Sequence, residues 1–212
     1  MSSSKFEVTL QTALIVGILY ITTKAIIKHS TFTGLNRIYS PIDKETYYVR
    51  HGPHQDGAVN MLSRIRSSLI RLYEKVMISN PEQAIYQKGL YMLKLRYPTA
   101  EHIRVYELDS SKYSEIAFNQ NKRDGIFICL RSDLSTMQIA DFETLMFISI
   151  HEMAHSMQQE TAHIIDGVTS HDAEFDAFND YLIYEALQLG LLSTSRMTPK
   201  MHCGSMVGTV QM

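Results

Sequence analysis

The chain has 212 residues, 45% hydrophobic and 20% charged, a balance that excludes an intrinsically disordered protein. The net charge of -2 hides an asymmetry, because residues 1–100 hold 13 Lys/Arg and 6 Asp/Glu, whereas residues 101–212 hold 7 and 16. The two cysteines are too few for a disulfide framework or a thiolate zinc cluster, and they suit a reducing compartment.

The N-terminal segment VTLQTALIVGILYITTKAII, residues 8–27, is the densest apolar run and carries no charge between Glu7 and Lys24. A helix that crosses a bilayer needs about 20 residues, so we predict a membrane anchor over residues 1–28. A cleaved signal peptide is the alternative, but only one basic residue precedes the run. Three basic residues follow it, and they place the C-terminal domain of this single-pass protein in the cytoplasm: Lys24, Lys28 and Arg37.

The next stretch, residues 29–56, is rich in turn-forming residues and shows no sustained hydrophobic period, so we predict a linker. From residue 57 onwards apolar residues recur three or four apart, which predicts an amphipathic helix over residues 57–79. A second helical stretch follows and ends at Pro98. We place the folded domain at residues 57–192 and a C-terminal tail at residues 193–212.

Two strands are predicted after these helices. HIRVYEL, residues 102–108, alternates apolar and polar residues, as a half-buried strand does. GIFICLR, residues 125–131, has a continuous apolar centre that indicates burial on both faces. We interpret Cys129, within this centre, as a small hydrophobic core residue.

The run DFETLMFISIHEMAHSMQQE predicts a helix with Asp141 as its N-cap and HEMAH in its last two turns. Histidines four apart project from the same side of a helix, so His151 and His155 can reach one metal ion. Glu152 points about a quarter-turn away, where it can contact a metal-bound water without binding the metal. The alternative is an ordinary helix that carries two histidines, because HExxH also arises by chance.

A catalytic zinc usually takes three protein ligands, so a third ligand must follow this helix. Position 161 is Thr161, which excludes the spacing of the metzincins. His163 would have to fold back sharply, whereas His171 opens a further helix predicted from about Asp172. Two carboxylates are also candidates, with the first as our second choice: Glu174 and Glu185.

HEMAH, followed by a loop and then HDAEF, resembles the WLM family of Wss-like metalloproteases and the related SprT-like domains. The upstream segment IAFNQNKRDGIFICLR is similar to the WLM segment whose strand runs beside the catalytic helix. The resemblance covers roughly residues 57–190. It implies an α+β, zincin-like metallopeptidase domain in which a small sheet packs on the HExxH helix, here preceded by a single transmembrane helix.

The resemblance also implies roles for individual residues. Zn²⁺ would be held by His151, His155 and His171, and Glu152 would act as the general base. Asp172 would hold the metal ligands in position without binding the metal itself. The GIFICLR strand would offer its edge to an extended peptide, so the expected function is a membrane-anchored zinc metallopeptidase that acts on a protein or peptide.

Members of these families cleave proteins crosslinked to DNA, but the acidic C-terminal half argues against a nucleic-acid partner here. The expected partners are therefore a peptide substrate and the membrane. The alternative function is a non-catalytic structural or assembly protein that retains the zincin fold, with assembly partners in the virion of a large DNA virus. Glu152 favours the enzyme, because a docking fold has no need of it.

Overall fold

The computed structural model describes residues 34–159, 164–165, 168–169 and 171–208, together with Ile15, Val16, Ile18 and Phe32. Contacts divide the chain into two compact units, Met1–Leu35 and Asn36–Met212. The predicted anchor helix at residues 8–27 lies almost entirely outside the described residues. Within the described part of the chain, no helix combines the length and the apolar character that crossing a bilayer requires.

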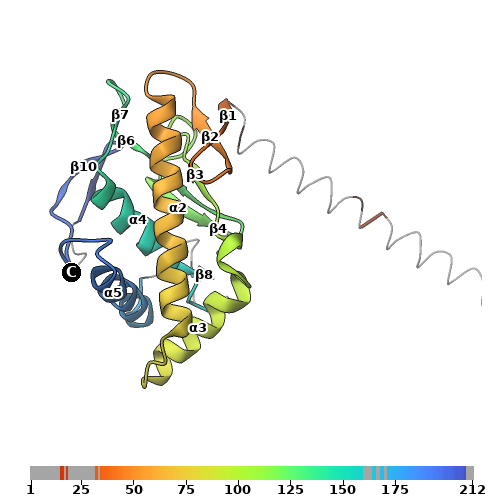
Figure 1. The fold of residues 1–212 in the computed structure, drawn as a ribbon, viewed down its shortest axis with the longest axis vertical. Helices are drawn as coiled ribbons and strands as arrows, with labels where there is room; N and C mark the ends of the chain where they lie inside the picture. Colours follow the sequence, from red (N-terminus) through yellow and green to blue (C-terminus); the bar gives the residue numbers. More distant parts are fainter. Residues whose placement is uncertain are drawn as a thin grey trace, which may run out of the picture. The chain divides into compact units, whose positions relative to one another are not determined.

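Among its described residues, the second unit holds four α-helices (Figure 1): α2 (Gln55–Ile78), α3 (Ala84–Arg96), α4 (Phe142–His155) and α5 (Ala173–Gln188). All four confirm helices predicted from the hydrophobic period. The long helix α2 contacts α3, α4 and α5, and its buried residues recur three or four apart, as in Leu62, Ile65 and Leu69. Helix α3 approaches α5 closely at Gly89, where a Cβ atom would lie 2.6 Å from the Phe178 ring.

The two helices that carry the HEMAH and HDAEF motifs begin at aspartate N-caps. The Asp141 carboxylate accepts a hydrogen bond from the Thr144 N–H at 2.9 Å, and the Asp172 carboxylate accepts one from the Phe175 N–H at 2.8 Å. Such a cap contributes about 1 kcal/mol, because it satisfies a backbone donor that the helix itself leaves unpaired. The starts of α4 and α5 are therefore encoded locally.

A three-stranded sheet packs beside these helices, with the order β3 (Val105–Glu107), β5 (Gly125–Ile128), β4 (Ala117–Gln120). Strand β5 lies in the centre, parallel to β3 and antiparallel to β4, with Val105 opposite Ile126 and Phe118 opposite Phe127. Every residue of β5 is buried, as its apolar run predicts. The 3₁₀ turn η1 (Ala100–His102) shortens the first predicted strand.

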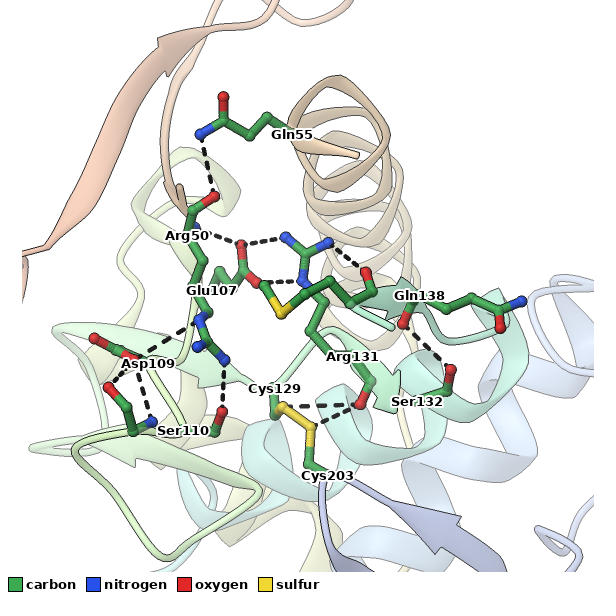
Figure 2. Close-up of polar contacts among 12 residues, drawn as sticks. Arg50, Gln55, Glu107, Asp109, Ser110, Cys129, Arg131, Ser132, Gln138 and Cys203 are labelled. Carbon is green, nitrogen blue, oxygen red and sulfur yellow. Dashed lines mark hydrogen bonds and ion pairs between the residues drawn. A yellow bond between two sulfur atoms is a disulfide. The ribbon is translucent and has the colours of Figure 1, made fainter. Parts of the chain in front are cut away.

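The predicted strand over residues 125–131 is broken after Ile128. Its last residue, Arg131, begins β6 (Arg131–Asp133), which pairs with β7 (Gln138–Ile139). Arg131 forms an ion pair with Glu107 of β3, with Nε and Oε1 2.8 Å apart and both side chains fully buried. The Arg50 N–H donates to the same carboxylate at 2.9 Å, as Figure 2 shows. Burial of these two charges is tolerated because they are paired and hydrogen-bonded.

The predicted linker over residues 29–56 is wrong for most of its length. Strands β1 (Leu35–Tyr39) and β2 (Thr46–Arg50) form a hairpin, and β2 packs on α2. Tyr47 and Val49 of β2 are buried in the core. The five residues of β2 alternate correctly for a strand, but turn-forming residues on both sides obscure so short a signal.

The predicted C-terminal tail is also structured, because β10 (Lys200–His202) and β11 (Ser205–Val207) form a hairpin. A disulfide between Cys129 and Cys203 joins this hairpin to the end of β5, as Figure 2 shows. The buried His202 ring donates from Nε2 to the Cys129 carbonyl at 2.8 Å. Cys129 is fully buried in the core, as its sequence context predicts, but a disulfide partner 74 residues away cannot be read from a local pattern.

Candidate metal centre

The HEMAH motif occupies the last two turns of α4, and this helix ends at His155. One turn separates the His151 and His155 rings, whose centroids lie 5.1 Å apart. The C-terminus of α4 is held by Arg96, which donates to the carbonyls of His155 and Ser156 at 3.2 and 2.6 Å. A cation that binds the last carbonyls of a helix also offsets the negative end of its dipole.

His171 precedes the N-cap of α5, and its ring faces the two histidines of α4. Its centroid lies 4.7 Å from that of His151 and 5.3 Å from that of His155. One nitrogen from each of the three rings falls within 4.8 Å of the other two. The structure thus brings together the three histidines that the sequence resemblance selected.

Phe175 forms one wall of this cluster. Its ring centroid lies 4.5 Å from those of His155 and His171 and 4.8 Å from that of His151. It lies one helical turn after His171 and is only 2% exposed. The hydrophobic pattern alone assigns Phe175 to the core stripe of α5, whereas the structure shows that its ring also contacts all three imidazoles.

The imidazoles of α4 are held in the neutral form that a metal requires. Burial, with the neighbouring rings of His155 and His171, lowers the pKa of His151 to about 3. Burial likewise lowers the pKa of His155 to about 4. Both imidazole rings are therefore uncharged near neutral pH, and each keeps a lone pair on one ring nitrogen.

Gln158 sets which nitrogen of His155 is free. The His155 Nδ1–H donates to the Gln158 Oε1 at 3.1 Å, so the lone pair lies on Nε2. Gln158 is 2% exposed, and a buried amide that fixes a ligand tautomer is typical of metal sites. The sequence patterns above assign Gln158 no role, although its position three residues after His155 is a local signal for this contact.

Glu152 is 6% exposed and lies between the first two histidines in sequence. Burial raises the pKa of its carboxyl to about 8. The backbone carbonyl of Glu152 accepts from Asn119 Nδ2 at 2.8 Å, and the same amide donates to Ser156 Oγ at 2.6 Å. Asn119 therefore ties β4 to the motif-bearing end of α4, a contact that the sequence did not reveal.

The other predicted residues lie outside the histidine cluster or have other partners. Asp172 caps α5 through its Oδ1. Glu174 pairs with Lys88 at 2.6 Å, and Glu185 lies 3.9 Å from Lys75. His163 falls outside the described residues, in the stretch around the short strands β8 (Ile164–Ile165) and β9 (Val168–Thr169).

The predicted role of the GIFICLR strand as a peptide-binding edge is wrong. Strand β5 forms ladders with β3 on one side and β4 on the other, so its backbone groups are already paired. The outer strand on the side of α4 is β4, which contacts that helix. A strand that is buried on both faces is central in its sheet, and the apolar run of β5 was already a sign of this.

The donor set fits a zinc ion. Three imidazoles can converge on one ion, and three protein ligands with one open position are typical of catalytic zinc. A second convergence of Cys129, His202 and Cys203 also occurs among the described residues. There the two sulfurs are bonded to each other, so they could act as thiolate ligands only after the disulfide is reduced.

No family model matches the chain, and no curated protein matches it. Among solved structures, that of Wss1 from Saccharomyces cerevisiae is similar at 19% identity and a TM-score of 0.40, covering 65% of this chain and 85% of Wss1. A Wss1 mutant gives 20% identity and a TM-score of 0.39, with 68% and 90% covered. Similarity at this level assigns neither a family nor an activity, so the function must rest on the residues of the site.

Proposed function

We propose that this chain is a zinc-dependent metallopeptidase that hydrolyses peptide bonds in a protein or peptide substrate. The observation that supports it most directly is the convergence of three histidine nitrogens within 4.8 Å of one another, beside a buried glutamate on the same helix. His151, His155 and His171 would hold the ion. When bound, zinc would supply a Lewis acid that polarises a carbonyl and lowers the pKa of water.

Glu152 would act as the general base. Its carboxylate takes the proton of the attacking water and then delivers it to the leaving nitrogen. In the metal-free chain, burial raises the pKa of Glu152 to about 8, and the charge of a bound cation would favour the carboxylate form that accepts the proton. Its place directly after His151 keeps it beside the ion without making it a ligand.

Substrate would bind in the extended form along β4. This strand has a partner on only one side within the described sheet, because the strand order ends with it. An added peptide strand would form backbone hydrogen bonds there, which read little of the substrate sequence. The Asn119 contacts to Glu152 and Ser156 would keep that edge aligned with the general base.

We also propose that residues 8–27 anchor the chain in a membrane, with the folded unit on the cytoplasmic side. The support is the long uncharged run and the basic residues that follow it. In that compartment thiols stay reduced, so the Cys129–Cys203 disulfide would form only under oxidising conditions.

The proposal is tested by hydrolysis of an unfolded protein such as casein by the full chain. We expect cleavage that stops when a chelator removes the metal and returns when zinc is added back. Cleavage that continues unchanged after metal removal would contradict the proposal. Stoichiometric zinc without any cleavage of several unfolded proteins would instead favour the non-catalytic alternative.

A further inference from the structure

A concave site is lined by residues just before and within α3 and by residues of α5, two helices that contact each other. Its cavity volume is about 440 Å³. Three tyrosines line it, Tyr86 from α3 and Tyr181 and Tyr184 from α5, together with the carboxylates of Glu82 and Asp180. We refer to these five residues as the tyrosine pocket.

Part of the tyrosine pocket is rigid. The rings of Tyr86 and Tyr181 are stacked, with centroids 4.7 Å apart and planes 17° apart. The Tyr181 hydroxyl is hydrogen-bonded to Ser79 Oγ at 2.6 Å, which ties α5 to the C-terminus of α2. A ligand that enters the pocket therefore meets a wall that is already ordered, and it loses less entropy on binding.

The third ring is exposed. Tyr184 leaves 57% of its surface open to solvent, although the other two tyrosines are partly or fully buried. An aromatic ring held at the mouth of a cavity can cover an incoming ligand with its face. The pocket therefore has a fixed wall of two rings and an accessible third ring.

The charge of the tyrosine pocket is negative. Glu82 and Asp180 are the only charged residues among those that line it. The nearby lysines are engaged elsewhere, since Lys88 pairs with Glu174 and Lys75 lies 3.9 Å from Glu185. Among the described residues, no ion pair includes Glu82 or Asp180. No lysine or arginine side chain in this part of the chain therefore neutralises these two carboxylates.

We propose that the tyrosine pocket binds an organic cation, either a quaternary ammonium group or the side chain of a lysine or arginine. Aromatic faces attract cations through their quadrupole, and the two carboxylates add a net opposite charge. An anion would be repelled, and a neutral apolar ligand would leave the carboxylates beside it without compensation.

The tyrosine pocket is separate from the proposed metal centre. His171 lies before α5, and Tyr184 lies eleven residues after Ala173, the first residue of that helix, a distance of about 16 Å at 1.5 Å per residue. Cation binding therefore does not depend on zinc or on peptide hydrolysis. The His171→Ala variant is expected to bind the cation as the unchanged chain does, so failure of one proposal is distinguishable from failure of the other.

The test is a titration of the full chain followed by NMR of the tyrosine rings. Choline is compared with 3,3-dimethylbutan-1-ol, in which carbon replaces the charged nitrogen at nearly the same shape. We expect saturable shifts of the Tyr86, Tyr181 and Tyr184 signals with choline, and binding of the neutral alcohol at least about tenfold weaker. Equal affinities would overturn the proposal, and so would the absence of shifts with every cation tried.

Lysine and arginine, each with both backbone ends blocked, form the second arm of the titration. Tighter binding of either one than of choline identifies a protein side chain as the natural occupant, whereas tighter binding of choline identifies a small quaternary ammonium compound. Both outcomes support a cation site and differ only in its source.

Matched variants localise the effect. Tyr184→Ala and Asp180→Asn are expected to weaken cation binding by about tenfold each, because each removes one favourable contact from an exposed position. The controls are Tyr91→Ala on α3 and Asp176→Asn on α5, both exposed and outside the pocket lining, and they should leave binding unchanged. Equal losses in the controls would overturn the assignment to this pocket.

Discussion

The three histidines of the proposed metal centre differ in how tightly the fold holds them. His155 is buried, His151 is half-buried, and His171 is exposed at the start of α5. His155 is further fixed by Gln158, and Phe175 packs against all three rings. The fold therefore already positions the two histidine rings of α4. A bound ion would be needed to fix the position of the His171 ring.

At the scale of single residues, Glu152 carries the proposed chemistry. Glu152→Gln keeps the shape of the side chain but cannot accept the proton, so we expect peptide hydrolysis to fall by at least about a hundredfold. Zinc content should stay the same, because Glu152 is not a ligand. Steady-state cleavage rates and metal analysis of the same preparation check both points, and activity near that of the unchanged chain would rule out the role of Glu152 as base.

The lowered pKa values of His151 and His155 also predict how the metal-free protein responds to acid. Unfolded histidines bind protons below about 6.5, whereas the folded pKa values are about 3 and about 4. Between these values the unfolded state binds more protons, so stability is present at neutral pH and is lost as the pH falls. The loss from about pH 7 to about pH 5 should be about 2 kcal/mol for each histidine.

Denaturant unfolding of the chelator-treated chain at several pH values measures this effect. The matched control is a variant with both His151 and His155 changed to Gln, in which the slope of stability against pH should flatten over the same range. An equal slope in the control would show that other groups cause the acid sensitivity.

At the scale of elements, the disulfide joins the C-terminal hairpin to the central sheet. It closes a loop of 74 residues, and the chain-entropy model assigns such a link about 4 kcal/mol. Cys203→Ser should lower the free energy of unfolding by up to that amount under oxidising conditions. In dithiothreitol the variant and the unchanged chain should become nearly equal, and a difference that persists there would mean that lost packing, not the lost bond, is the cause.

The helices could be predicted from sequence because their signals are local. The period of α2 and the aspartate caps of α4 and α5 lie within a few residues of the structure that they specify. The hairpins at residues 35–50 and 200–207 escaped prediction because each strand has only three to five residues. The Cys129–Cys203 pairing depends on where the chain returns in space, which no local pattern contains.

The site follows the same rule. His151, Glu152 and His155 are recognisable because one helix fixes their spacing, and His171 came from the resemblance of HDAEF to a family motif. Asn119 could not be assigned a role, since its hydrogen bond to Glu152 of α4 depends on tertiary packing, whereas Gln158 lies only three residues after His155, its hydrogen-bond partner. The apolar run of β5 indicates a central strand, but the identity of its neighbours, β3 and β4, depends on tertiary pairing.

At the scale of the whole molecule, the proposed anchor determines where the chain is found. With residues 8–27 in a bilayer, the full chain should stay in the membrane fraction after high-salt and alkaline washes, because only detergent releases a spanning helix. A variant with three aspartates placed within this run should appear in the soluble fraction. Release of the unchanged chain by the alkaline wash would point to peripheral attachment.

The central claim is that three histidines, two on α4 and one just before α5, form one zinc site, and metal content tests it most directly. The full chain purified with zinc should hold about one ion per chain, and His171→Ala should lose most of it. Glu174→Ala, three residues further along, should retain the ion, because Glu174 pairs with Lys88. Zinc retained by His171→Ala, or absent from the unchanged chain, would contradict the account.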